Sequence, residues 1–282
     1  MTLSVVIITH NEEANIGRTL ESVSPLVSDG KGEIIVVDSG SIDRTVEIAK
    51  SLGAKVFVEE WKGYAAQKNS AIEKATGDWI LSLDADEELS TDLTAHLLRA
   101  LTDNDYGPFE WAPTSNFKLR SEYLRDAPGS LPMAFWIARR NYFLGRWIEH
   151  GGFYPDRKLR LFARGGARFD ESRMVHEDLR TNRKTAVIKV GALLHHSYPT
   201  LSDYIEHMNR YSSLGAEMVV AKGKVRFSVI NVVLRPLTMF VYNYFFRLGF
   251  LDGRKGLLLH LYHAVYVSWK YAKAWELTRK QQ

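Results

Sequence analysis

Residues 77–87 read GDWILSLDADE, and this stretch decides the fold. The apolar run at 79–83 predicts a buried strand, and two carboxylates, Asp84 and Asp86, follow where that strand ends. Residues two positions apart in an extended chain share one side, so both carboxylates can approach one hard cation. Such oxygen ligands suit Mg²⁺ or Mn²⁺, with water and phosphate oxygens as the remaining ligands. Alternatively, the acidic residues open a helix whose dipole favours negative charge.

Strand and helix signals alternate before this stretch. Apolar runs at 3–9, 33–38 and 54–58 predict further strands, and helical spacing at 15–23, 41–51 and 65–75 predicts helices between them. Apolar strands separated by helices indicate βαβ units, so we predict an α/β fold with a mainly parallel sheet flanked by helices. Ligands of such sheets bind outside the carboxyl ends of the strands. The polar residues at 9–12, 38–41 and 84–86 should therefore converge on one crevice.

The pattern changes after residue 103. Residues 104–157 are rich in Pro, Gly and aromatic side chains and predict irregular loops and short strands, and residues 158–200 predict further short strands and turns. His195 and His196 are adjacent, so their side chains point in different directions, and we interpret them as strand residues rather than metal ligands. From Leu201 onward the pattern is helical.

Composition and charge narrow the possible functions. The absence of cysteine excludes disulfides, thiolate zinc sites and cysteine nucleophiles. The first residues have neither a basic region nor an apolar region of signal-peptide length, so we expect a cytoplasmic or cytosol-facing protein. Residues 222–282 hold eleven Lys and Arg against two acidic residues, a net +9, which leaves −5 for residues 1–221 of a chain with +4 overall. A basic, apolar tail on an acidic body indicates a surface that meets anionic lipid, or a solvated basic face.

Several of these segments together resemble the family 2 glycosyltransferases. The matching segments are SVVIITHNE at 4–12, IIVVDSGSIDRT at 34–45, Lys68-Asn69 and GDWILSLDAD at 77–86, which agree in order, spacing and residue type. Further segments are similar to the bacterial lipopolysaccharide core β-1,4-glucosyltransferase subgroup: YPDRKLRLF at 154–162, VHE at 175–177 and GFLDG at 249–253. The resemblance implies a GT-A fold, a nucleotide-diphospho-sugar donor with UDP-hexose favoured, an inverting displacement, and a saccharide or glycolipid acceptor.

The resemblance also implies a role for each residue that matches the donor-binding motifs. These roles place Thr9, Asn11 and Glu12 at the base and ribose, Asp38 at the base, Lys68 near the diphosphate, Asp84 at the ribose or metal, and Asp86 at the metal. A bound Mg²⁺ or Mn²⁺ would neutralise charge as the diphosphate leaves. Asp38 could instead form an Asx-turn in DSGS, and Lys68 could be a solvated helix residue.

An inverting transfer also needs a carboxylate that takes the proton of the acceptor hydroxyl. Glu177 matches the His-Glu ending of the subgroup pattern, and Asp178 competes with it because many relatives end in Glu-Asp. These acidic residues could alternatively open a helix. His176 would contact the diphosphate or serve the structure. Arg157 and Arg160 would contact the diphosphate or an anionic acceptor, or lie on a solvated basic strand edge.

The resemblance and the change of pattern suggest a division of the chain. We expect a GT-A catalytic domain over residues 1–200, with a nucleotide-binding half at 1–103 and an acceptor half at 104–200, followed by an amphipathic helical extension at 201–282. Residues 227–246 approach the length of a membrane span, but Arg235 in the middle argues against a simple span. Residues 257–269 are too short to span. Interleaved aromatic and basic residues favour peripheral attachment to the cytosolic face of the inner membrane, and the alternative is helices packed on the catalytic domain or a partner.

Other functions fit the sequence less well. A sugar nucleotidyltransferase needs a Gly-rich, basic loop after the first strand, where this chain has the acidic HNEE at 10–13. The motifs of Rossmann dehydrogenases and P-loop enzymes are absent. A non-catalytic scaffold that binds nucleotide sugars would not need Asp84, Asp86 and Glu177 together. The basic tail is apolar, which argues against nucleic-acid binding.

Overall fold

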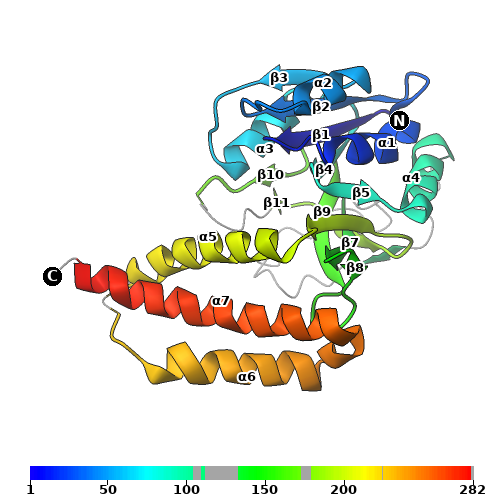
Figure 1. The fold of residues 1–282 in the computed structure, drawn as a ribbon. Helices are drawn as coiled ribbons and strands as arrows, with labels where there is room; N and C mark the ends of the chain where they lie inside the picture. Colours follow the sequence, from blue (N-terminus) through cyan, green and yellow to red (C-terminus); the bar gives the residue numbers. More distant parts are fainter. Residues whose placement is uncertain (104–108, 112–132, 173–178, 224, 281–282) are drawn as a thin grey trace. The chain divides into compact units, whose positions relative to one another are not determined.

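The computed structural model describes residues 1–103, 109–111, 133–172, 179–223 and 225–280 (Figure 1). The chain forms two compact units. The first contains Met1–Arg139 and Arg157–His195, and the second contains Arg140–Asp156 and His196–Gln282. The helical extension therefore shares its unit with a short segment from the middle of the chain. The predicted domain boundary at residue 200 stays a prediction.

The first unit is built on the predicted parallel strands. Strands β3 (Lys55–Val58), β2 (Gly32–Asp38), β1 (Leu3–Thr9) and β4 (Trp79–Asp84) lie side by side in that order, and all are parallel. In this register Thr9 is opposite Asp38, and Ile8 is opposite Asp84. The carboxyl ends of three strands therefore meet at one edge of the sheet, as the sequence predicts.

Helices cover both faces of this sheet because successive strand residues point to opposite sides. Leu3, Val5 and Ile7 pack in a core with apolar residues of α1 (Ile16–Val27), α2 (Thr45–Ser51) and α4 (Thr91–Asp103). Val6 and Ile8 pack in a second core with α3 (Tyr64–Glu73). The ribbon in Figure 1 shows these helices around the strands. The predicted α/β fold is confirmed.

The rest of the first unit makes the sheet mixed rather than mainly parallel. Strand β9 (Asp156–Ala163) pairs antiparallel with β4. The sheet then continues through β7 (Ala134–Phe143), β12 (Thr185–Ile188) and β6 (Phe109–Trp111). β5 (Glu87–Leu89) pairs antiparallel with β13 (Leu193–Tyr198), and β10 (Arg168–Phe169) pairs with β11 (Leu179–Arg180). The ten-residue β7 is longer than the short strands predicted for 104–157.

Glu33 ties the start of β2 to its neighbours. Its carboxylate accepts hydrogen bonds from the Ser4 hydroxyl (2.7 Å), from the backbone N–H and hydroxyl of Thr76 (2.8 and 2.7 Å), and from the Lys55 ammonium (2.7 Å). Burial alone would raise the pKa of Glu33, but these donors lower it to about 2. Because the folded pKa lies below the unfolded value of 4.5, the ionised carboxylate stabilises the fold above that pH.

We expect Glu33→Gln to lower the free energy of unfolding by about 2 kcal/mol at neutral pH. The deficit relative to the wild type should shrink as the pH falls from about 4.5 towards 2, where the wild-type carboxyl group becomes protonated. Urea unfolding at a series of pH values measures this. Glu47→Gln is the matched control, since Glu47 forms an exposed ion pair with Arg44. A difference in unfolding free energy between Glu33→Gln and the wild type that does not change with pH would contradict the lowered pKa of Glu33.

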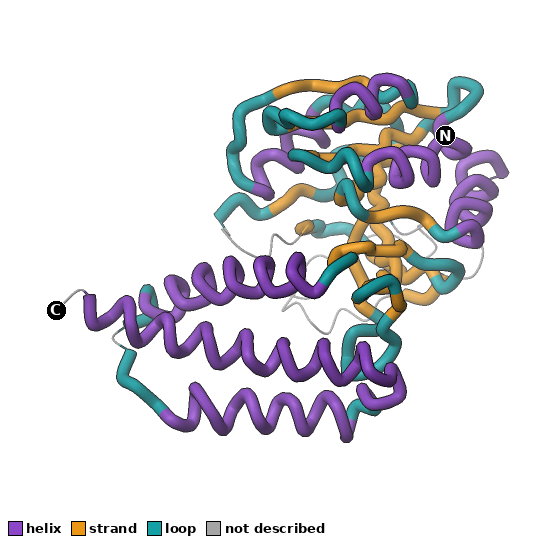
Figure 2. The backbone as a smooth tube through the Cα atoms, viewed as in Figure 1, coloured by secondary structure: helices purple, strands orange, loops and turns teal. Residues whose placement is uncertain are grey.

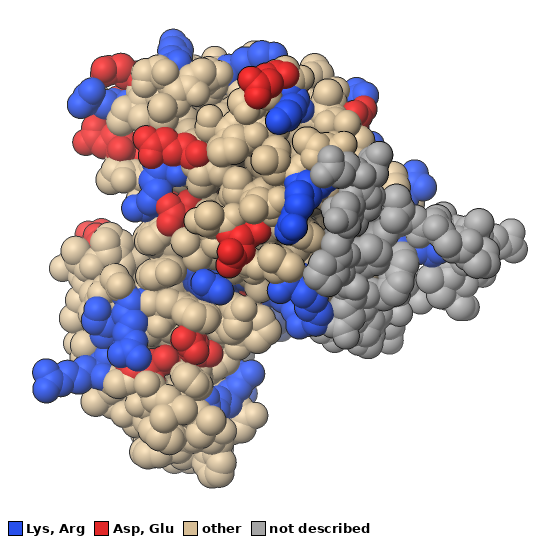
Figure 3. Space-filling model, turned by 90° about the vertical axis from the view of Figure 1, so that its right-hand side faces the viewer, with Lys and Arg blue, Asp and Glu red and all other residues tan. Residues whose placement is uncertain are grey.

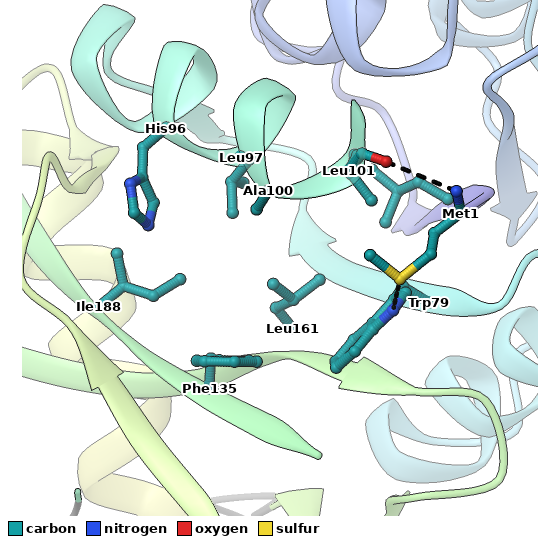
Figure 4. A pocket seen from close by; sticks show the side chains of 10 residues that line it. Met1, Trp79, His96, Leu97, Ala100, Leu101, Phe135, Leu161 and Ile188 are labelled. Carbon is teal, nitrogen blue, oxygen red and sulfur yellow. Dashed lines mark hydrogen bonds between the residues drawn. The ribbon is translucent and has the colours of Figure 1, made fainter. Parts of the chain in front are cut away.

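A small apolar cavity lies under α4 in the first unit (Figure 4). Leu3 and Trp79, the first residues of β1 and β4, line it together with Phe135 and the buried His96. The Trp79 indole N–H donates to the sulfur of Met1 (3.2 Å) at its rim. The cavity therefore lies at the amino ends of these strands, away from the edge where their polar residues gather.

The second unit is helical in its C-terminal part (Figure 2). Helix α5 (Leu201–Val220) begins with a capping box between Thr200 and Asp203. A run of helix follows through η3 (Ile230–Leu234), α6 (Arg235–Val241) and η4 (Tyr242–Phe246), of which η3 and η4 are π-helical. After the short η5 (Gly249–Asp252), α7 (Gly253–Lys280) packs against both α5 and α6. Within the described residues, no helix is both long enough and apolar enough to cross a membrane.

Candidate functional site

The site forms where β1, β2 and β4 end. Thr9, the last residue of β1, is buried, and its hydroxyl has no hydrogen-bond partner within the described residues. Asn11 follows in the left-handed region with φ 55°, a conformation that Asn tolerates better than most residues. Its N–H donates to the Ser41 hydroxyl (2.8 Å), and its side-chain oxygen accepts from the N–H of Ile42 (2.9 Å). Asn11 thus joins the loop after β1 to the loop after β2.

Asp38, the last residue of β2, is fully buried and shapes its own loop. One carboxylate oxygen accepts from the N–H groups of Gly40 (2.9 Å) and Ser41 (2.8 Å), and the other accepts from the Ser41 hydroxyl (2.5 Å). This is the Asx-turn that the sequence allowed as an alternative. The turn also delays the next helix, because α2 begins at Thr45 rather than at the predicted Ser41. The contact of Asp38 with the base stays a prediction.

Glu12 lies close to the carboxylate pair. Its N–H donates to the Thr45 hydroxyl (2.7 Å), and its side chain accepts from the Asn15 amide (2.8 Å). Burial raises the pKa of Glu12, and the negative charges of Asp86, Asp43 and Asp84 raise it further. The loop after β1 therefore carries a third carboxyl group near Asp84 and Asp86.

Asp84, at the end of β4, is held between two cations from distant parts of the chain. Lys68 on α3 lies 2.7 Å from one carboxylate oxygen, and Arg160 on β9 lies 2.5 Å from the other. Burial alone would raise the pKa of Asp84, but the charges of Arg160 and Lys68 hold it well below its usual range. Lys68 is buried, so the alternative of a solvated helix residue does not apply. The structure brings Lys68 and Asp84 together, as a shared site requires.

Glu87 extends this group of charges into the core. The side chain is fully buried, and one oxygen accepts from Arg160 (2.8 Å) and from Arg139 on β7 (3.0 Å). The other oxygen accepts from the backbone N–H of Asp84 (3.1 Å). Burial would lower the pKa of Arg160, but the two carboxylates raise it. Arg160 is therefore a buried bridge between Asp84 and Glu87, and the alternative of a solvated strand edge is wrong for it.

Asp86 has a partner of its own. Nε2 of His195 on β13 lies 3.2 Å from its carboxylate. Burial alone would raise the pKa of Asp86, but His195 lowers it. The two histidines do lie on a strand and diverge as predicted, because His196 stacks on Tyr142, with ring centroids 4.7 Å apart. The contact between His195 and Asp86 is a site feature that the sequence interpretation missed.

The residues present fit a hard divalent cation that keeps ligands from outside the protein. Within the described part of the chain, no group of three His, Cys, Asp or Glu side chains is arranged to hold a metal. Asp84 and Asp86 together supply two carboxylates, and Mg²⁺ or Mn²⁺ is commonly held by one or two carboxylates together with water and substrate phosphates. Metal binding at this edge therefore stays a prediction that needs the donor's oxygens.

Of the remaining predicted site residues, one is exposed and three lie outside the described residues. Arg157 is exposed near the start of β9, so a solvated edge position describes it. His176, Glu177 and Asp178 lie outside the described residues, so the position of the catalytic base stays a prediction. Glu87 and Arg139 were not predicted as site residues. A charged residue such as Arg139 within the otherwise apolar start of a strand was the one available signal for a buried ion pair.

Comparison with known proteins agrees with this architecture. The model of glycosyl transferase family 2 matches residues 4–165. Over 282 residues the chain is 29% identical to the lipopolysaccharide core biosynthesis glycosyltransferase LpsC of Rhizobium meliloti. The aligned region covers 98% of this chain and 93% of LpsC. It is 30% identical to an uncharacterized glycosyltransferase of Rickettsia typhi, over 99% of this chain and 89% of that protein.

A solved structure shares the fold. The mannosyltransferase PcManGT of Pyrobaculum calidifontis, solved with GDP-Man and Mn²⁺, has a TM-score of 0.53 and 15% identity, covering 96% of this chain and 86% of its own. The mixed sheet, its flanking helices and the carboxylates at the strand ends thus define a glycosyltransferase of the GT-A fold. The chain belongs to glycosyl transferase family 2.

Proposed function

We propose that this enzyme transfers a hexose, with inversion, from a nucleotide-diphospho-sugar to a hydroxyl of a saccharide or lipid-linked glycan. A UDP-sugar is the favoured donor. The observation that carries the proposal is the meeting, at the carboxyl edge of the sheet, of Asp84 with buried Lys68 and Arg160 and of Asp86 with His195. The similarity to LpsC along nearly the whole chain supports an acceptor in the lipopolysaccharide core or a related envelope glycan.

The donor's base and ribose would lie against the loops after β1 and β2. Thr9 offers a buried hydroxyl without a partner in the described structure, which suits a ligand group as its partner. Asn11 joins the two loops and Asp38 holds the turn in the second loop, so their first role is to hold a preformed surface. Glu12 is close enough to Asp84 and Asp86 for their charges to raise its pKa, and a ribose hydroxyl could donate to it.

The diphosphate would lie beside Asp84 and Asp86. Mg²⁺ or Mn²⁺ bound by these two carboxylates would neutralise the negative charge that develops on the leaving diphosphate. Lys68 adds a buried positive charge, and Arg160 holds Asp84 ionised. The chain would thus keep its metal-binding oxygens deprotonated throughout the neutral pH range. Glu177, or its competitor Asp178, would take the proton from the acceptor hydroxyl.

The proposal is tested by incubating the purified protein with Mn²⁺ and a panel of UDP-, GDP-, ADP- and CMP-linked sugars, and following nucleotide release. We expect slow hydrolysis of one donor, faster with a membrane extract as acceptor and abolished by a chelator. Release of the free nucleotide together with a product of inverted anomeric configuration would complete the assignment. If no donor is cleaved under any of these conditions, the proposal fails and a nucleotide-sugar-binding scaffold becomes the better explanation.

Peripheral attachment to the cytosolic face of the inner membrane belongs to the same proposal. A lipid-linked acceptor is presented at a membrane surface, so an enzyme that uses it gains from lying there. The C-terminal helices would provide the attachment.

A further inference from the structure

The helical run around α6 leaves one apolar face uncovered in the second unit. Its members lie on η3, α6 and η4, and each is between 48% and 75% exposed. We call this set the α6 face: Ile230, Val233, Leu234, Leu237, Tyr242, Phe245 and Phe246. Apart from the adjacent pairs Val233–Leu234 and Phe245–Phe246, successive members are three to five positions apart, which is the spacing of residues along one side of a helix. Exposed aliphatic and aromatic side chains gathered in this way mark an interaction surface.

The structure gives different surroundings to the two apolar stretches of the C-terminal region, residues 227–246 and 257–269. Residues 257–269 belong to α7, which lies between α5 and α6 (Figures 1 and 2). Leu259, Ala264 and Val267 of that stretch are buried. Packing within the helical unit therefore accounts for much of this stretch, although Leu257 and Leu261 remain 40% and 46% exposed. It does not account for the α6 face, which needs another partner.

Arg235, which argues against a membrane span, does not interrupt this face. Its guanidinium donates to the hydroxyl of Tyr271 on α7 and stacks over the same ring, with the guanidinium carbon 5.0 Å from the ring centroid. The arginine is therefore directed towards α7. A helix that lies in the plane of a membrane surface can keep such a residue on the side away from the lipid.

The charges around the face indicate what covers it. Exposed Arg226 precedes it, and exposed Arg247 and Arg254 follow it. The one acidic residue between positions 222 and 275, Asp252, is buried and accepts hydrogen bonds from the backbone N–H groups of Glu149 (3.3 Å) and His150 (2.9 Å). The lowest part of the surface in Figure 3, at the level of α6 in Figure 1, shows neither Asp nor Glu. A second copy docked through this face would bring like charges together, whereas an anionic lipid surface complements them.

We propose that the α6 face inserts into the interfacial region of an anionic lipid bilayer, with α6 lying in the plane of the membrane and α7 behind it. Apolar side chains would enter the boundary between headgroups and acyl chains, and the flanking arginines would meet the lipid phosphates. The proposal deepens the peripheral attachment of the proposed function, because it names α6, and not α5 or α7, as the lipid-binding element.

The chain contains no cysteine, so a single introduced thiol can report insertion at one chosen position. Leu237→Cys and Phe246→Cys, labelled with the polarity-sensitive fluorophore NBD, place probes on the α6 face. Met218→Cys is the matched control, since Met218 is an exposed apolar residue of α5. Mixed phosphatidylcholine and phosphatidylglycerol vesicles should blue-shift and brighten the two α6 probes, and leave the Met218 probe unchanged. Equal shifts at all three positions, or none, would overturn the proposal.

A vesicle flotation assay tests the binding energy independently of the labels. Replacing both Leu234 and Leu237 by Glu should weaken binding to the mixed vesicles more than tenfold, since two charges would enter the apolar boundary. Met218→Glu should bind as the wild type does, and Arg254→Gln should bind about fivefold more weakly. Light scattering adds the competing outcome. If the wild type is a dimer that does not bind vesicles, and the double variant is a monomer, the face belongs to a second copy and the lipid proposal is overturned.

The two proposals fail separately in these experiments. Hydrolysis of the nucleotide sugar needs neither vesicles nor the α6 face, so the double variant should retain it at the wild-type rate. Retained hydrolysis without vesicle binding by the wild type would reject the lipid surface alone. Vesicle binding without hydrolysis of any donor would reject the proposed transfer and leave the lipid surface standing.

Discussion

Asp86→Asn is expected to lower the rate of metal-dependent nucleotide release by about 10²- to 10³-fold. The substitution keeps the shape of the side chain but removes the charge that would bind Mg²⁺ or Mn²⁺. His195, which faces Asp86 at 3.2 Å, can still form a hydrogen bond with the amide, so the local fold should survive. Initial rates over a series of Mn²⁺ concentrations measure the effect, and the apparent affinity for Mn²⁺ should fall together with the rate.

Glu88→Gln is the matched control for Asp86→Asn. Glu88 belongs to the same acidic sequence, but its carboxylate pairs with the partly exposed Arg18 at 3.2 Å. We expect its rate to remain within about twofold of the wild type, because a partly exposed ion pair contributes little. Wild-type Mn²⁺ dependence in Asp86→Asn would contradict the assignment of Asp86 as a metal ligand, whatever its effect on the rate.

Arg160→Met is expected to lower the free energy of unfolding by about 3 to 5 kcal/mol. Arg160 contacts both Asp84 and Glu87. Its removal leaves the fully buried Glu87 with Arg139 as its remaining cation, and Asp84 with Lys68. Methionine fills much of the volume, so the loss reports uncompensated charge rather than a cavity. Urea unfolding at neutral pH measures it.

Arg157→Met on the same strand provides the comparison. Arg157 is exposed, and surface substitutions of this kind change stability by less than about 0.5 kcal/mol. A second comparison lowers the pH towards the depressed pKa of Asp84, because protonation of Asp84 should narrow the difference in unfolding free energy between Arg160→Met and the wild type. Equal stability of the two methionine variants at neutral pH would show that the buried ion pairs contribute nothing, against the geometry described above.

The parallel half of the fold could be predicted because short apolar runs and helical spacing within each segment mark its strands and helices. The strand at Leu3–Thr9 has the predicted bounds, and β2 and β4 differ from prediction by a single residue at one end. Helix starts were harder to predict. Residues 41–44 were predicted as the start of a helix, but the carboxylate of Asp38 uses the N–H groups of Gly40 and Ser41 to make a turn. Competition between a side chain and the helix for the same backbone groups is not visible in periodicity.

The site was only partly predictable for a related reason. Strand ends could be predicted to converge, since parallel strands share an edge, and this placed Thr9, Asp38 and Asp84 together. The partners of the carboxylates come from β9, β7 and β13, and the pairing of those strands with β4 and β5 depends on a register that no local pattern specifies. Arg160 therefore looked like an edge residue in the sequence, and it is a buried ion-pair partner in the structure.

The antiparallel β9 also has a consequence for the order in which a newly made chain can fold. Glu87 leaves the ribosome about 70 residues before Arg160, a delay of roughly 4 to 14 s at common elongation rates. Arg139 emerges before Arg160, but until the first of them is present the Glu87 carboxylate lacks the cations that neutralise it in the fold, and a lone carboxylate resists burial. We therefore expect the acidic edge of the first four strands to stay exposed to water until β9 has been synthesised. Translation speed between residues 87 and 160 thus sets how long the nascent sheet stays open to other contacts.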